Sequence, residues 1–228
     1  MRSFSAFIPF ALILAAGCTA AKPSAIPTAT ILPATVAPST ANVPPIPTVR
    51  PTEPAAPVAE VVMVIDDFEG TQTDWTICTD PECTDSSAVS VALSSEHASQ
   101  GKQALQIKYV KNDRPKALFF IQKPMDFSTG RYVKFDVFNP GTIDGVGFAL
   151  TTGPNSTWHE SDSVPVEAGK TTTLSFDLTA DNYKTAATNW EFRATIADLN
   201  NVARLSIIIY PKVSGYAFID NIDLTNTP

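Results

Sequence analysis

The sequence predicts an all-β domain over residues 61–228, a two-sheet antiparallel β-sandwich of the jelly-roll type. Three observations predict it: segments in which apolar and polar residues alternate, turn signals rich in glycine, proline and asparagine between them, and the lack of any long helical pattern. The alternation runs through segments 104–109, 132–138, 146–150, 174–178, 205–210 and 218–224. Helices are expected only as short stretches near residues 185–190 and 196–202.

Composition excludes several classes of function. The chain has 228 residues, 44% of them hydrophobic, and a net charge of −7. Residues 61–228 hold 13 basic residues against 21 acidic ones, so we expect no nucleic acid partner, because binding phosphates requires a cationic face. The two histidines, His97 and His159, are far apart in the sequence, which excludes a histidine-rich zinc site.

Residues 1–17 have the pattern of an export signal: a basic residue, an apolar run and three small residues before Cys18. The segment resembles a bacterial lipobox. That resemblance implies that Cys18 is lipidated and becomes the first residue of a membrane-anchored lipoprotein. Thr19 follows instead of aspartate, so we expect an extracytoplasmic protein at the cell surface. The alternative is an ordinary secretory signal with an incidental cysteine.

Residues 18–60 combine the lipidated cysteine with a segment that predicts a disordered stalk. Ten of the 19 prolines lie between residues 19 and 60, among alanines and threonines and without any aromatic residue. Proline-rich chains favour extended polyproline II, so some 40 residues could reach about 120 Å. The segment therefore predicts a spacer between a membrane and the folded domain.

Two cysteines remain, and they flank a turn-like segment. Cys78 and Cys83 enclose Thr-Asp-Pro-Glu, and in an oxidising compartment such a pair favours a disulfide. A metal-thiolate pair is the alternative, but no further cysteine or nearby histidine completes that site.

Acidic residues lie beside apolar ones in the first and last predicted strands. In segment 218–224, alternation predicts that Asp220 shares a face with the apolar residues, where a carboxylate must be paired, bound to metal or at the rim. The first strand ends in a similar acidic segment, at residues 66–69. Such oxygen ligands suit a hard cation such as Ca²⁺. The alternative is a hydrogen-bonded carboxylate or a salt bridge to Lys102 or Arg204.

Four segments carry a resemblance to a known group: residues 66–70, Trp75, residues 98–105 and residues 218–222. They resemble the galactose-binding-like jelly rolls used as carbohydrate-binding modules, family 11 and its relatives above all, and the resemblance covers nearly all of residues 61–228. It implies a structural Ca²⁺. The ligands it implies are Glu69, a carbonyl near Ser99, and Asp220.

Sugar binding needs aromatic rings that stack on the C–H surfaces of the sugar and polar groups that bind its hydroxyls. We expect such residues on the sheet faces that point away from the core. Tyr132 and Tyr210 are candidate platforms, and Trp158 follows a turn at residues 153–155. The candidate residues together are Tyr132, Lys134, Asp136, Trp158, Arg193 and Tyr210. The alternative is that the aromatic residues only cover the sheet. Trp75 and Trp190 are expected in the core.

No catalytic motif is present in the sequence. It contains neither a paired-glutamate pattern, a nucleophile elbow nor a zinc-protease motif, so it predicts a noncatalytic protein. We therefore expect a monomeric, surface-anchored protein that binds a polysaccharide or oligosaccharide. The alternative is a structural or protein-interaction β-sandwich of a cell-envelope lipoprotein.

Overall fold

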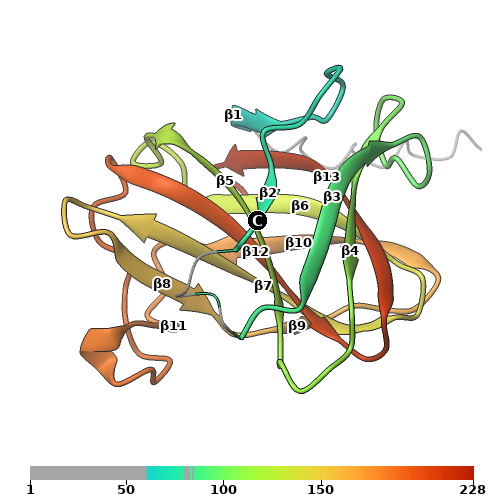
Figure 1. Ribbon diagram of the computed structural model, residues 1–228. Helices are drawn as coiled ribbons and strands as arrows, with labels where there is room; N and C mark the ends of the chain where they lie inside the picture. Colours follow the sequence, from blue (N-terminus) through green and yellow to red (C-terminus); the bar gives the residue numbers. More distant parts are fainter. Residues whose placement is uncertain (1–60, 80–82, 84) are drawn as a thin grey trace, which may run out of the picture. The chain divides into compact units, whose positions relative to one another are not determined.

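Figure 1 shows a computed structural model of the protein, which describes residues 61–79, 83 and 85–228. The predicted signal peptide 1–17, the lipidation site Cys18 and the stalk 18–60 lie outside the described residues. In the part of the chain that is described, no helix is long and apolar enough to span a bilayer.

The first layer is a six-stranded antiparallel sheet. Its order is β10-β6-β13-β4-β3, with β1 paired to β13. The strands are β1 (Val61–Asp66), β3 (Ala88–Ser94), β4 (Ala104–Tyr109), β6 (Tyr132–Asn139), β10 (Lys170–Asp177) and β13 (Gly215–Thr225).

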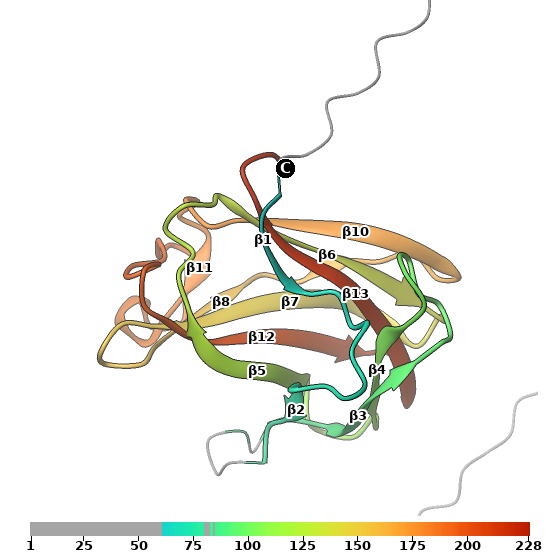
Figure 2. The ribbon, with the colours of Figure 1, turned by 90° about the horizontal axis from the view of Figure 1, so that it is seen from above.

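The second layer is a seven-stranded antiparallel sheet. Its order is β11-β8-β7-β12-β5-β2, with β9 paired to β7. The strands are β2 (Thr76–Ile77), β5 (Ala117–Met125), β7 (Ile143–Thr152), β8 (Thr157–Ser161), β9 (Val164–Pro165), β11 (Tyr183–Lys184) and β12 (Val202–Pro211). Figure 2 shows the two layers one above the other, β10, β6 and β13 in one and β8, β7, β12 and β5 in the other. The predicted two-sheet sandwich is confirmed.

The core lies between the layers because every second side chain of each strand points inward. In β6, Val133, Phe135 and Val137 are fully buried, as is Phe148 of β7. The ring of Phe176 from β10 lies 5.6 Å from that of Phe135 and 5.2 Å from that of Phe148, so it joins the two layers. Each such aromatic side chain contributes about 2 kcal/mol through burial.

Five of the six predicted alternating segments lie wholly in strands, and the sixth, 174–178, runs one residue past the end of β10. The strand β5 was not predicted. Its apolar run does not alternate because both of its faces are covered. Phe119 and Ile121 face the core, while Leu118 and Phe120 form a second apolar cluster on the outer face. Of the predicted short helices, a 3₁₀ turn at Ala186–Thr188 is present, whereas residues 196–202 hold none.

The predicted disulfide between Cys78 and Cys83 is confirmed. Cys78 packs in the outer apolar cluster with Leu118 and Phe120, and its N–H donates a hydrogen bond to the Leu118 carbonyl at 3.2 Å. The bridge therefore holds Cys83 beside the outer face of the seven-stranded sheet.

Candidate functional site

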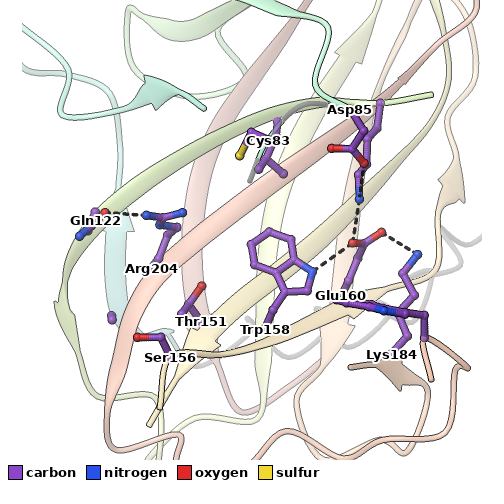
Figure 3. Close-up of a pocket in the computed structure, with 13 residues that line it drawn as sticks. Cys83, Asp85, Gln122, Thr151, Ser156, Trp158, Glu160, Lys184 and Arg204 are labelled. Carbon is purple, nitrogen blue, oxygen red and sulfur yellow. Dashed lines mark hydrogen bonds and ion pairs between the residues drawn. The ribbon is translucent and has the colours of Figure 1, made fainter. Parts of the chain in front are cut away.

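The outer face of the seven-stranded sheet carries an open groove of about 940 Å³. Its side chains come mainly from β5, β8, β11 and β12 and from the loops beside them, as Figure 3 shows. The lining residues are Cys83, Asp85, Lys116, Leu118, Gln122, Thr151, Ser156, Trp158, Glu160, Lys184, Trp190, Ala203 and Arg204.

The groove is hollow because β7, which runs between β8 and β12, has small outward-facing residues. Gly147, Ala149 and Thr151 share that face, since their neighbours Phe148 and Leu150 belong to the core. A Cβ added to Gly147 would lie 3.3 Å from the ring of Tyr210. Larger side chains on the neighbouring strands therefore stand higher than β7 and form the walls.

A buried carboxylate lies in the wall of the groove. Glu160 is only 1% exposed. Its Oε1 accepts from Lys184 Nζ at 2.8 Å, and its Oε2 accepts from Lys116 Nζ at 3.0 Å. Burial alone would raise the pKa of Glu160, but the hydrogen bonds and charges of Lys184 and Lys116 outweigh it and lower that pKa below its usual value. The carboxylate is therefore ionised at neutral pH.

Glu160 also fixes two aromatic side chains. The indole Nε1–H of Trp158 donates to Glu160 Oε2 at 3.1 Å, and the Tyr210 hydroxyl lies 3.4 Å from Oε1. Burial, and then the charge of Glu160, raises the pKa of Tyr210 above its usual range, so the phenol stays a neutral donor. Figure 3 shows the indole of Trp158 in the middle of the groove, held at one edge by Glu160.

At the other end of the groove, Arg204 lies over the ring of Phe120. Its Nη2 donates to Gln122 Oε1 at 2.9 Å, and its guanidinium carbon lies 4.2 Å from the centre of the Phe120 ring. The groove thus combines an aromatic ring with fixed donors and acceptors. That combination suits a ligand with C–H faces and hydroxyl groups.

Two of the residues predicted for sugar binding lie on the sheet that bears the groove. Trp158 lines the groove. Tyr210 packs against Gly147 on the same face of the sheet but is not among the lining residues. Arg193 lies in the loop after the 3₁₀ turn and pairs with the exposed Glu191 at 3.1 Å, outside the groove lining.

The other three, Tyr132, Lys134 and Asp136, lie on β6 in the opposite sheet. There the loop before β4 covers Asp136, which is 8% exposed and accepts from the Ser99 hydroxyl at 2.6 Å. Lys134 donates to the Pro228 carbonyl at 3.2 Å. The candidate residues are therefore divided between two faces, because alternation predicts whether a side chain points outward but not which sheet carries it.

Sequence reasoning did not assign the groove residues Lys116, Glu160, Lys184 and Arg204 to the site. The period-2 spacing of Trp158 and Glu160 was a usable signal, since it places both on one face of a strand.

The prediction that Trp75 lies in the core is confirmed, because Trp75 is 3% exposed, but the same prediction for Trp190 is wrong, because Trp190 is 55% exposed. Trp190 adopts a φ of 62° after the 3₁₀ turn and lies at the groove.

A family profile described as "Mannanase, galactose-binding domain-like" matches residues 66–205, more than half of the chain. The chain belongs to this family. The matched segment includes every residue that lines the groove, from Cys83 to Arg204. A search of curated protein sequences finds no match.

Solved structures with the same fold include carbohydrate-binding modules. One is the family 11 module of the cellulosomal cellulase Lic26A-Cel5E of Clostridium thermocellum, with 15% identity, a TM-score of 0.55, and coverage of 75% of this chain and 97% of that one. Another is a Clostridium thermocellum family 11 module in complex with a β-1,3-1,4-mixed-linked tetrasaccharide, with 17% identity, a TM-score of 0.55 and coverage of 75% and 98%. An exo-β-agarase matches with 17% identity and a TM-score of 0.54, over 72% of this chain and 25% of that one. At these identities the likeness concerns the fold.

In this galactose-binding-like domain, Asp220 does not share the apolar face as alternation predicts. Asn221 has a φ of 52°, and the pairing of β13 with β6 shifts between Asp220 and Asp223. This irregularity turns both Ile219 and Ile222 toward the core and leaves Asp220 on the outer face. The prediction failed because an extra residue in a strand reverses the alternation beyond it.

Asp220 and Glu69 hold the two ends of the loop that contains Ser99. Asp220 Oδ2 accepts from the Ser99 N–H at 2.7 Å and the Gln100 N–H at 3.0 Å. It also lies 3.0 Å from the Ser99 hydroxyl, whose proton the nearer Asp136 carboxylate accepts. Glu69 Oε1 accepts from the Lys102 and Gln103 N–H groups at 2.7 and 2.9 Å.

Both carboxylates thus receive N–H groups from the loop, whereas a Ca²⁺ site needs carbonyl and carboxylate oxygens with free lone pairs. Within the described residues, no group of three His, Cys, Asp or Glu side chains is placed to hold a metal. As arranged here, Glu69, Ser99 and Asp220 do not fit a Ca²⁺ ion. The resemblance implies calcium and this arrangement of donors does not favour it, so chelation distinguishes the two.

Removing divalent cations is expected to leave the melting temperature unchanged, because the loop amides already satisfy Glu69 and Asp220. Calorimetry of the protein with and without a chelator checks this. A fall of several degrees on chelation, reversed by Ca²⁺, would instead establish the metal.

Proposed function

We propose that the protein binds a polysaccharide or oligosaccharide chain in the groove of the seven-stranded sheet without cleaving it. The observation that carries this proposal is Trp158, whose indole is fixed in an open groove by the ionised Glu160. Membership of the galactose-binding-like family supports it, as does the tetrasaccharide named for a family 11 module of the same fold.

The groove residues match the two kinds of surface that a sugar ring presents. An indole face attracts the C–H groups of a pyranose, which are apolar and slightly positive. Lys116 and Lys184 supply ammonium donors, and the exposed carboxylate of Asp85 supplies acceptor lone pairs, so ring hydroxyls find both kinds of partner. Because these ions hold one another in place, their side chains lose little conformational freedom on binding.

The carboxylates of the groove argue against hydrolysis of the bound chain. Glycoside cleavage needs a protonated acid and a second carboxylate about 5 to 9 Å away. Here Lys116 pairs with both Asp85, at 3.5 Å, and Glu160, at 3.0 Å. The lowered pKa of Glu160 keeps it unprotonated, which is the wrong state for a general acid.

We further propose that a lipid on Cys18 and the stalk of residues 18–60 display this domain outside the cell. The sequence of residues 1–60 supports this arrangement. A noncatalytic domain so placed would hold a glycan near the membrane for separate enzymes or importers.

Replacing Trp158 with alanine is expected to weaken glycan binding by about tenfold or more, because the stacking surface is lost. Affinity electrophoresis through a panel of soluble polysaccharides measures this as a loss of retardation. Tyr216→Ala is the matched control, since Tyr216 is an aromatic residue 43% exposed on β13 of the other sheet.

The control variant is expected to be retarded as strongly as the unmodified protein. Two outcomes would contradict the proposal: no polysaccharide retards the unmodified protein, or Tyr216→Ala loses binding while Trp158→Ala keeps it.

A further inference from the structure

The groove is positively charged on a domain that is otherwise acidic. Residues 61–228 carry 13 basic residues against 21 acidic ones. Among the described lining residues the balance is reversed, with the cations Lys116, Lys184 and Arg204 against the anions Asp85 and Glu160. Two of these cations, Lys116 and Lys184, neutralise the anions through ion pairs of 2.8 to 3.5 Å.

Arg204 is the cation left over. Among the described residues its guanidinium has no carboxylate partner, and Gln122, a neutral amide, accepts from its Nη2. A guanidinium carries five N–H donors in a planar fork that matches a carboxylate. The guanidinium carbon lies 4.2 Å from the centre of the Phe120 ring, so this contact and the hydrogen bond to Gln122 both restrain the side chain.

The sheet register places Arg204 in line with the indole. Arg204 of β12 pairs with Thr151 of β7, and Thr151 pairs with Trp158 of β8. Neighbouring strands lie about 4.8 Å apart, so the backbones of Arg204 and Trp158 are separated by about 10 Å across the sheet. A hexose stacked on the indole therefore brings its C6 substituent, or that of the adjoining sugar, within reach of the guanidinium. Thr151, between them, is too small to block it.

We propose that Arg204 binds a carboxylate of the glycan, so that the groove prefers a chain containing uronic acid to the same chain in neutral form. This inference rests on the proposed function, since it assigns a substrate class to the same groove. An ion pair formed in a partly enclosed site is worth more than one in open water, because fewer solvent dipoles compete for the charges. Glu160 does not oppose the bound carboxylate strongly, because its own charge is already balanced by Lys116 and Lys184.

The test compares matched polysaccharides. Soluble β-glucan and soluble mannan are each used as the neutral polymer and after selective oxidation of C6 to the carboxylate. The dissociation constants of the full chain are measured by affinity electrophoresis at low and at high ionic strength. The variants are Arg204→Gln, which keeps an amide donor but removes the charge, and Lys108→Gln, which removes an exposed charge from β4 of the other sheet.

The expected result is that at least one oxidised polymer binds about tenfold more tightly than its neutral parent at low ionic strength, with the preference shrinking as salt is added. Arg204→Gln is expected to reduce that ratio to about one, whereas Lys108→Gln leaves it unchanged.

Equal affinity for oxidised and neutral polymers, or a preference that survives Arg204→Gln, would overturn this inference and leave the proposed function standing. Failure of every polymer to bind in either form would reject the proposed function, and this inference with it.

Discussion

Replacing Asp220 with alanine is expected to lower the free energy of unfolding by about 3 kcal/mol. The side chain is 2% exposed, and it accepts hydrogen bonds from the N–H groups of Ser99, Gln100 and Asn221. Removing both carboxylate oxygens therefore leaves these three N–H groups without that partner. Urea denaturation of the variant and the parent protein measures the difference.

Asp144→Ala is the matched control, because Asp144 is an exposed aspartate on β7. It is expected to leave the unfolding midpoint nearly unchanged. Asp220→Asn is expected to lie between the two, since its amide oxygen still accepts from the loop. An Asp220→Ala variant as stable as Asp144→Ala would show that the carboxylate does not anchor the loop.

Replacing Glu160 with glutamine is expected to cost about 3 kcal/mol of stability and to abolish glycan binding. The variant removes the negative charge between the Lys116 and Lys184 ammonium groups. It also replaces one of the two acceptor oxygens, which Lys116 shares with Trp158 and Lys184 shares with Tyr210, by an amide donor. Chemical denaturation and affinity electrophoresis of the same sample measure the two effects. Glu167→Gln is the control, because its partner Lys170 is exposed and surface pairs contribute little.

The pH dependence of stability should change in the same variant. A carboxyl group whose folded pKa lies below its unfolded value stabilises the protein above about pH 4.5, and this contribution is lost as the pH falls through the folded pKa. The parent protein is therefore expected to lose more stability than Glu160→Gln between neutral pH and pH 3. Parallel losses in the two proteins would show that Glu160 is not stabilised by its lysines.

The architecture could be predicted from the sequence because one face of each sheet packs against the core, so apolar residues alternate with polar ones along many strands. β4 was predicted with its exact bounds at Ala104–Tyr109, since one face of that strand is apolar and the other is not. β5 was missed because Leu118 and Phe120 cover the outer face as Phe119 and Ile121 cover the inner one.

The groove could be predicted only in part. Trp158 was identified, but the residues around it come from segments distant in the sequence, such as Lys116 and Lys184, and only the order of strands in the sheet brings them together. Asp136 looked available because it points away from the core, whereas Ser99 of another loop covers it. Long-range pairing and loop coverage are not encoded in the period of a single strand.

The central claim is that the seven-stranded sheet, and not the six-stranded one, holds the glycan. The most direct measurement is an NMR titration of the ¹⁵N-labelled protein with a fragment of a polysaccharide that it binds. The titration is followed through the indole N–H signals of the three tryptophans of the protein. Trp158 lines the groove, whereas Trp75 is 3% exposed and donates to Asp66 Oδ2 at 2.9 Å. We expect the chemical shift of the Trp158 indole N–H to change as ligand is added and that of the Trp75 indole N–H to stay the same. A Trp158 signal that stays fixed while the amide signals of Tyr132 and Lys134 on β6 move would contradict the account.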